Sequence, residues 1–299
     1  MGEWLTEQLD RTPFRCTLTG ANDLIRNIEN KQDRIREYFD AHPRAVGKIF
    51  TAEKRQKRFM DNALSYLVLE GGEGIGIVPS RDKTPEQRQQ EAEDLARLMA
   101  YQDACEFMHD AAVSPDGYLD GALMINAHSK LYARDPESRN FVRGRFRNEY
   151  DNEIVVGQGY FDPVPGELVG PRMTLMLYTY HNAWRKDHPI VKGAKFVTEY
   201  FRIQPHMDAN KRVALMALNF ILEQHGYPDI YIGKSQTERF YAALKTGILT
   251  RDVTDLATLI AENVEMRCDR IIDEIRDYRI RAFAGAQAAS ENDDDIENA

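Results

Sequence analysis

The sequence predicts a mainly helical protein. Apolar residues recur at three- and four-residue spacing along most of the 299-residue chain, as they do on the buried face of amphipathic helices. Helix-start signals precede several of these stretches, and only one segment, 153–165, instead combines β-branched residues with turn glycines and prolines. Hydrophobic residues make up 42% of the chain and aromatic residues 10%, which is enough for a substantial core and excludes a disordered or fibrous protein.

Residues 1–83 are expected to form an N-terminal helical region. Its clearest helix, 51–70, carries aromatic and aliphatic residues at helical spacing and ends before Gly71 and Gly72. A loop should follow as far as residue 83, because glycine and proline interrupt the helical pattern there.

A strong helix start opens the next region, which we expect to span residues 84–281. Thr84 is a preferred N-cap residue, Pro85 suits the first helical position, and Gln87 completes a capping box. This helix should run to about Ala112. Further helices are expected at 120–132, 171–186, 189–202, 209–225, 236–246 and 254–281. Segment 153–165, with Ile154, Val155 and Val156, is expected to form a short β-hairpin or extended flap, and 282–299 an acidic disordered tail.

Charge and cysteine usage narrow the class of protein. Asp and Glu outnumber Lys and Arg by 48 to 39, which argues against a dedicated nucleic-acid binder. Five of these acids lie in the last nine residues, so removing that stretch takes the net charge from −9 to −4. Three scattered cysteines, Cys16, Cys105 and Cys268, favour reduced thiols in a cytoplasmic protein. We expect neither a secretory leader nor a membrane-spanning helix, because the N-terminus is charged and no run of about 18 apolar residues exists.

The segment between two strongly apolar helices, residues 203–212, carries the residues best suited to chemistry. Pro205 disfavours helix at Gln204, so a loop is expected there, and Asp208 is expected to cap the following helix. The loop would then end at a helix N-terminus, where backbone N–H groups and the helix dipole favour an anion.

The residues after Asp208 suit a phosphate. Ala209 is small enough for close approach, and Asn210, Lys211 and Arg212 place an amide and two cations in the first helical turn. Asp208 is a natural Mg²⁺ ligand beside a polyphosphate. An equally simple interpretation is that Asp208 only caps the helix and that the two cations are solvated.

The segment Gln204-Pro205-His206-Met207-Asp208-Ala209-Asn210-Lys211-Arg212 resembles the Fic/Doc motif, H-P-F-x-(D/E)-(G/A)-N-(G/K)-R. The resemblance continues in Gly144-Arg145-Phe146-Arg147 before the proposed flap, in Gly226-Tyr227, and in Phe240-Tyr241. It covers about 84–259. It implies a helical Fic fold that transfers AMP from ATP to a protein hydroxyl, with Asp208 holding Mg²⁺ and Ala209, Asn210 and Arg212 cradling phosphates. The flap would align the protein target by strand addition.

The sequence departs from the family pattern at the catalytic position. Gln204 replaces the motif histidine, and a Gln amide has no useful proton affinity near neutral pH, so transfer is expected to be weak or lost. His206 stands at the aromatic position of the motif, where a packed structural role is favoured over replacement of the base. Leu215 replaces a second arginine of the longer motif, as in Doc-like members.

Three more residues are assigned by the same resemblance. Glu70, at the end of helix 51–70, corresponds to an inhibitory glutamate of the family, although a solvated residue before a glycine cap is at least as natural. Asn219 and Tyr241 lie where family members contact the adenine or the pocket wall, and each could equally be structural.

The leading hypothesis is therefore a Fic-type nucleotide-binding protein with weak or lost AMP transfer. The alternatives are a degenerate module that binds nucleotide or a protein partner without chemistry, and a Doc-like protein phosphotransferase. The sequence names neither the target protein nor the oligomeric state.

Overall fold

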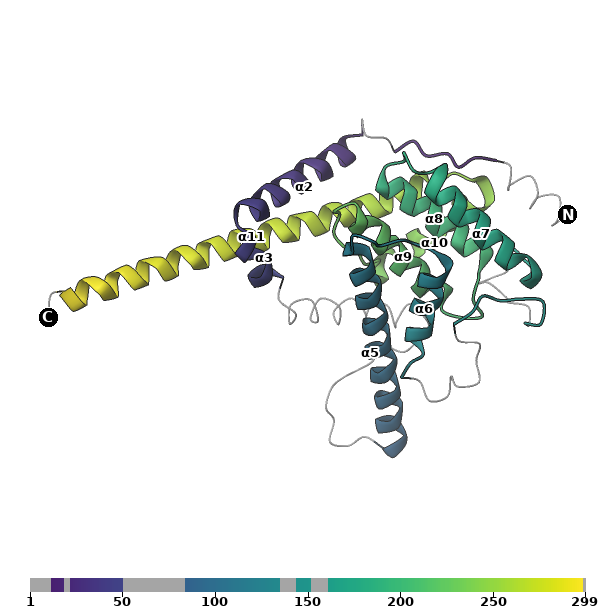
Figure 1. Ribbon diagram of the computed structural model, residues 1–299, viewed down its shortest axis with the longest axis horizontal. Helices are drawn as coiled ribbons and strands as arrows, with labels where there is room; N and C mark the ends of the chain where they lie inside the picture. Colours follow the sequence, from purple (N-terminus) through teal and green to yellow (C-terminus); the bar gives the residue numbers. More distant parts are fainter. Residues whose placement is uncertain (1–11, 19–21, 51–83, 135–143, 152–160, 298–299) are drawn as a thin grey trace.

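The computed structural model describes residues 12–18, 22–50, 84–134, 144–151 and 161–297. Within these ranges the chain is mainly helical, as the sequence predicts (Figure 1). The helices are α2 (Asp23–Ala41), α3 (Pro43–Ile49), α5 (Pro85–Val113), α6 (Gly121–Leu131), α7 (Gly166–Asn182), α8 (Pro189–Ile203), α9 (Asn210–Gln224), the 3₁₀ turn η3 (Lys234–Gln236), α10 (Thr237–Thr250) and α11 (Thr254–Glu297). No described residue lies in a β-strand, and the described part of the chain has one isolated parallel bridge, between Arg15 and Asp252.

The start of α5 confirms the predicted capping box. The Thr84 hydroxyl accepts a hydrogen bond from the Gln87 backbone N–H at 3.3 Å, and the Gln87 side chain accepts one from the Thr84 N–H at 3.0 Å. Two otherwise unpaired donors at the helix end are thereby satisfied.

Several helix boundaries differ from the sequence-based expectation: α7 ends at Asn182 rather than 186, α10 ends at Thr250 rather than 246, and two further differences are larger. Helix α7 begins at Gly166 rather than at Pro171, which lies inside it. A proline there removes one backbone hydrogen bond, a local cost that the burial of Val169, Met173 and Met176 offsets. Helix α11 continues to Glu297 instead of ending near residue 281, since residues 282–297 contain many good helix formers and no proline.

The centre of the fold is helix α8, which packs against α7, α9, α10 and α11. Thirteen of its fifteen residues are buried, and so are ten of the fifteen in α9. Because the loop between α8 and α9 joins the two most enclosed helices, its backbone is anchored at both ends.

The N-terminal helix α2 lies alongside α11 (Figure 1). Ile25 and Ile28 are fully buried, and Lys31 forms ion pairs with Glu265 at 3.0 Å and with Asp269 at 2.7 Å. The first described segment and α2 therefore pack on the C-terminal part of the chain.

Several predicted features lie outside the described residues. These are the helix 51–70 with Glu70, and the flap residues Ile154, Val155 and Val156. The division of the chain at residues 84 and 281 stays a prediction. Among the described helices, none combines the length and the apolar character needed to cross a membrane.

Candidate functional site

The loop between α8 and α9 is shaped by two residues in the left-handed region. Gln204, the C-cap of α8, has φ 49° and ψ 64°, and Ala209, the N-cap of α9, has φ 60° and ψ 13°. Non-glycine residues occupy this region at some energetic cost, so the surroundings must hold them there. The prediction that Asp208 caps α9 is wrong, because Ala209 takes that position and makes no side-chain cap bond.

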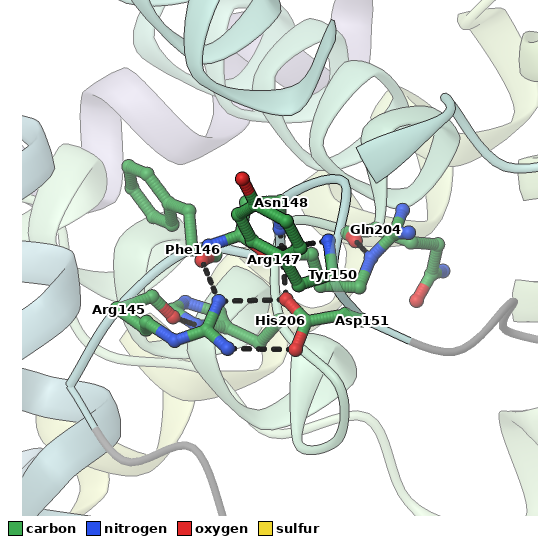
Figure 2. Close-up of polar contacts among 8 residues, drawn as sticks. All are labelled: Arg145, Phe146, Arg147, Asn148, Tyr150, Asp151, Gln204 and His206. Atoms are coloured by element: carbon green, nitrogen blue, oxygen red, sulfur yellow. Dashed lines mark hydrogen bonds and ion pairs between the residues drawn. The ribbon is translucent and has the colours of Figure 1, made fainter. Parts of the chain in front are cut away.

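Arg147 holds the first of these turns (Figure 2). Its guanidinium is buried and donates to the carbonyl oxygens of Gln204 at 2.7 Å, Ile203 at 3.2 Å and Val164 at 2.8 Å. Its backbone N–H donates to the Pro205 carbonyl at 2.7 Å. Burial lowers the pKa of Arg147, and the three carbonyl dipoles supply the acceptors that the buried cation requires.

The segment 144–151 that carries Arg147 is itself braced by an ion pair. Arg145 donates two hydrogen bonds to the Asp151 carboxylate, at 2.6 and 2.7 Å, and the Asn148 N–H donates a third at 2.8 Å (Figure 2). The Arg145 side chain lowers the pKa of Asp151 chiefly through this hydrogen bonding. A bidentate pair of this kind fixes orientation as well as contributing energy.

His206 is a packed structural residue. Its side chain is 1% exposed, its Nδ1 donates to the Arg145 carbonyl at 3.1 Å, and its ring stacks on His128 with centroids 3.9 Å apart and planes 3° apart. Burial lowers the pKa of His128 to about 4 and that of His206 well below its usual value. Such an enclosed ring of low basicity is poorly placed to take a proton from a target hydroxyl.

Asn210 closes the loop on itself. Its side-chain oxygen accepts from the His206 N–H at 2.8 Å, and its amide nitrogen donates to the His206 carbonyl at 2.7 Å. The amide predicted to hold phosphate is therefore occupied in bracing the loop, and its contribution to an anion site is the shape of the backbone.

Asp208 and Arg212 come together at the mouth of the loop. An Arg212 Nη2 lies 3.2 Å from an Asp208 carboxylate oxygen, and the Tyr132 hydroxyl donates to the same oxygen at 2.6 Å. The Asp208 side chain is 70% exposed, so the carboxylate remains open to a ligand. Partial desolvation would raise the pKa of Asp208, but Arg212 and Tyr132 outweigh it and hold this pKa below the ordinary value.

The three remaining predicted site residues, Lys211, Tyr241 and Asn219, differ in their contacts. Lys211 donates to the Tyr241 hydroxyl at 3.2 Å, so this pair connects the start of α9 to α10. The Asn219 amide exchanges hydrogen bonds with the backbone N–H and carbonyl of Ile230, both at 3.0 Å. Asn219 thus connects α9 to the segment that follows it, and both atoms of its amide group are engaged with Ile230 rather than with the loop.

Sequence reasoning missed the residues that support the loop from elsewhere in the chain. His128 comes from α6, Tyr132 is the C-cap of that helix, and Arg147 comes from a turn that the sequence marks only as basic. A buried Arg beside a motif has no periodic signature, so only the tertiary contacts reveal its role.

The fold and the loop together describe a helical protein that carries an exposed carboxylate and two cations at the start of one helix. The model of the Fic/DOC family matches residues 118–222, which include the loop, α8 and α9. The chain contains a Fic/DOC family domain.

Sequence relatives agree with this assignment. The chain is 30% identical over 128 residues to the protein adenylyltransferase Fic of Drosophila ananassae and to that of Drosophila melanogaster, a stretch covering 42% of this chain. That stretch spans 24% and 25% of those two proteins, so the match covers about a quarter of their length.

Solved structures show the same fold. Fic-1 from C. elegans (residues 134–508) aligns with 92% of this chain and 75% of its own at a TM-score of 0.66 and 16% identity. A Fic domain containing signaling protein from Bacteroides thetaiotaomicron aligns with 85% of this chain and 97% of its own at a TM-score of 0.59 and 16% identity.

Proposed function

We propose that the chain binds Mg²⁺ and ATP at the start of α9 and that its transfer of AMP to a protein hydroxyl is weak or lost. The observation that carries this proposal is the state of Gln204. Its side-chain amide is buried and donates to the Phe201 carbonyl of its own helix at 2.9 Å. An amide held in this way offers no base for a target hydroxyl.

The phosphate subsite would use the cations and the backbone at the start of α9. Ala209 and Asn210 shape the backbone, whose first N–H groups are available to an anion at any helix N-terminus. Arg212 and Lys211 would supply positive charge, and Arg212 can exchange its contact with the exposed Asp208 for a phosphate oxygen. Tyr241, which contacts Lys211, is the proposed wall residue for the base.

Asp208 is the proposed Mg²⁺ ligand. Its lowered pKa keeps the carboxylate ionised at neutral pH, and its exposure fits a metal that takes one or two carboxylates together with phosphate oxygens and water. When bound, Mg²⁺ would neutralise charge on the phosphates. No group of three or more His, Cys, Asp or Glu suited to a metal exists in the described part of the chain, so this site needs the nucleotide to complete it.

The relatives are named adenylyltransferases, which supports AMP transfer as the class of reaction. The proposed target is a cytoplasmic protein whose identity is unknown. The flap at 154–156 would align it. With Gln204 in place, any remaining transfer would rest on positioning and electrostatics.

A direct test measures Mg·ATP binding by calorimetry, followed by label transfer from ATP to candidate proteins, for the wild type and for Gln204→His. We expect both forms to bind ATP and the histidine variant to transfer label about 10²–10⁴-fold faster. Absence of ATP binding by both folded forms overturns the proposal. Equal transfer by both forms overturns the part that concerns Gln204.

A second candidate, a Doc-like phosphotransferase, is favoured by Lys211 and by Leu215, whose side chain is buried and apolar. Label position separates the two reactions. Transfer from α-labelled ATP indicates AMP transfer, whereas transfer from γ-labelled ATP alone indicates a kinase.

A further inference from the structure

A cavity lies away from the loop between α8 and α9. It has a volume of about 680 Å³ and is enclosed by residues from α2, α3, α5, α9 and α11 and from the segment after α9. This volume falls within the range typical of small-molecule sites. None of the loop residues 204–212 lines it, so the cavity is separate from the proposed nucleotide site.

One part of its wall is apolar. Five side chains from five helices, together with Phe50 at the end of α3, form this surface: Ile35, Val46, Phe50, Met108, Met216 and Ile271. Such a wall favours a ligand with an apolar body, because burying apolar area is the main source of affinity in small pockets.

The rest of the wall carries an excess of negative charge. Four carboxylates line the cavity, those of Glu106, Asp110, Glu223 and Asp229, against the cation of Arg267 and the imidazole of His109. His109 Nδ1 lies 2.9 Å from a Glu223 oxygen, and Arg267 Nε lies 3.7 Å from an Asp229 oxygen.

Two of these acids, both exposed to solvent, form no ion pair with any described residue. They are Glu106, which accepts a hydrogen bond from the neutral Gln102 amide at 2.9 Å, and Asp110. This negative charge also affects the pKa values of neighbouring groups. Burial raises the pKa of Glu223, with Asp229 adding to the shift, and the same two causes raise the pKa of Tyr231 well above its ordinary value.

Arg267 supplies an independent sign of a missing partner. Its side chain is 9% exposed, and its Nη1 has no hydrogen-bond partner among the described residues, the nearest paired acid being Glu274 at 3.8 Å. A buried guanidinium N–H without an acceptor is costly, and a ligand oxygen at this point would satisfy it.

We propose that this cavity binds a small organic cation that has an apolar body and a hydrogen-bond acceptor. The ammonium would lie among the acids at Glu106 and Asp229, the body would cover the wall at Met216 and Phe50, and the acceptor would meet Arg267. A bare metal ion would leave the apolar wall uncovered, and the described residues hold no cluster of three ligands for one.

The test uses the full-length protein and a matched set of probes in calorimetry. The cationic probe is 5-methoxytryptamine, its neutral counterpart is 5-methoxytryptophol, its anionic counterpart is 5-methoxyindole-3-acetate, and tryptamine lacks the acceptor. We expect 5-methoxytryptamine to bind at least about 10-fold more tightly than the neutral and anionic probes, a difference of about 1.4 kcal/mol. Tryptamine should bind more weakly than its methoxy derivative.

Variants locate the binding. Glu106→Gln and Asp229→Asn should each weaken the cationic probe several-fold, and Val46→Trp, which fills the cavity from a 39% exposed position, should abolish its binding. Glu167→Gln, which removes an exposed acid on α7, is the control and should change nothing. Thermal melts confirm that each variant is folded.

The proposal is overturned if no probe binds the folded wild type, or if the anionic probe binds as tightly as the cationic one. It is also overturned if Val46→Trp is folded and still binds 5-methoxytryptamine with unchanged affinity. ATP titrations on the same samples report separately on the nucleotide site.

Discussion

The guanidinium of Arg147 and the main-chain carbonyl of Gln204 are joined by a 2.7 Å hydrogen bond, although 57 residues separate them in the chain. Together with the hydrogen bonds from Arg147 to Ile203 and Val164, this contact fixes the end of α8 and the start of the loop between α8 and α9. Gln204 is therefore oriented by a side chain that lies far from it in the sequence.

Replacing Arg147 by methionine should lower the free energy of unfolding by about 2–4 kcal/mol, because three carbonyls lose a charged donor in a buried place. It should also weaken Mg·ATP binding, since the loop loses its anchor. Chemical denaturation and calorimetry measure the two effects. The matched control is Arg185→Met, at an exposed position just after α7. Unchanged ATP affinity in a folded Arg147 variant would show that the loop is held without it.

Removing the Tyr132 hydroxyl should affect metal and nucleotide binding more than stability. Tyr132→Phe deletes the 2.6 Å donor to Asp208, a residue exposed to solvent, so we expect Mg·ATP affinity to change by about 2–5-fold. Calorimetry with and without Mg²⁺ measures it. Tyr178→Phe, at a 67% exposed position on α7, serves as the control. An effect of equal size without Mg²⁺ would contradict a role through Asp208.

Asn219→Ala should destabilise the protein by about 2 kcal/mol, because the backbone N–H and carbonyl of Ile230 both lose their partner. ATP affinity should remain unchanged, since the Asn219 amide is engaged with Ile230. Denaturation and nucleotide titration on the same sample decide between the two roles. A loss of ATP affinity greater than about 5-fold, with stability intact, would restore Asn219 to the nucleotide site.

Glu199 should set part of the acid sensitivity of the fold. It is buried between Arg202 and Arg251, which outweigh the effect of desolvation and lower its pKa in the folded state. A lowered folded-state pKa gives stability that is complete above the unfolded pKa, near the ordinary value of 4.5, and that is lost as the pH falls through the folded value.

Glu199→Gln should cost about 3–5 kcal/mol at neutral pH, because two buried arginines lose their counter-charge. The same variant should lose less further stability than the wild type between neutral pH and pH 3. Urea denaturation at a series of pH values measures both. Glu238→Gln, on the exposed face of α10, is the control. Parallel stability curves for wild type and Glu199→Gln would contradict this account.

The sequence predicts most helices of this fold because their signals are local. The capping box at Thr84 depends on residues within one turn, and it is present. The left-handed turn at Ala209 was missed, since nothing local distinguishes it from a cap at Asp208. Its support comes from α6 and from Arg147, which are distant in sequence, and contacts of that kind follow from packing rather than from periodicity.

The pairing of α2 with α11 has a consequence for the order in which the protein is made. The charge of Lys31 is compensated by Glu265 and Asp269, which lie more than 230 residues later in the chain. During synthesis the apolar face of α2, with Ile25 and Ile28, leaves the ribosome long before the helix that covers it. Because α11 also packs against α8, the pairing of α2 with α11 and the completion of the core both require the C-terminal helix, and the α2–α11 contacts are among those of highest contact order in the fold.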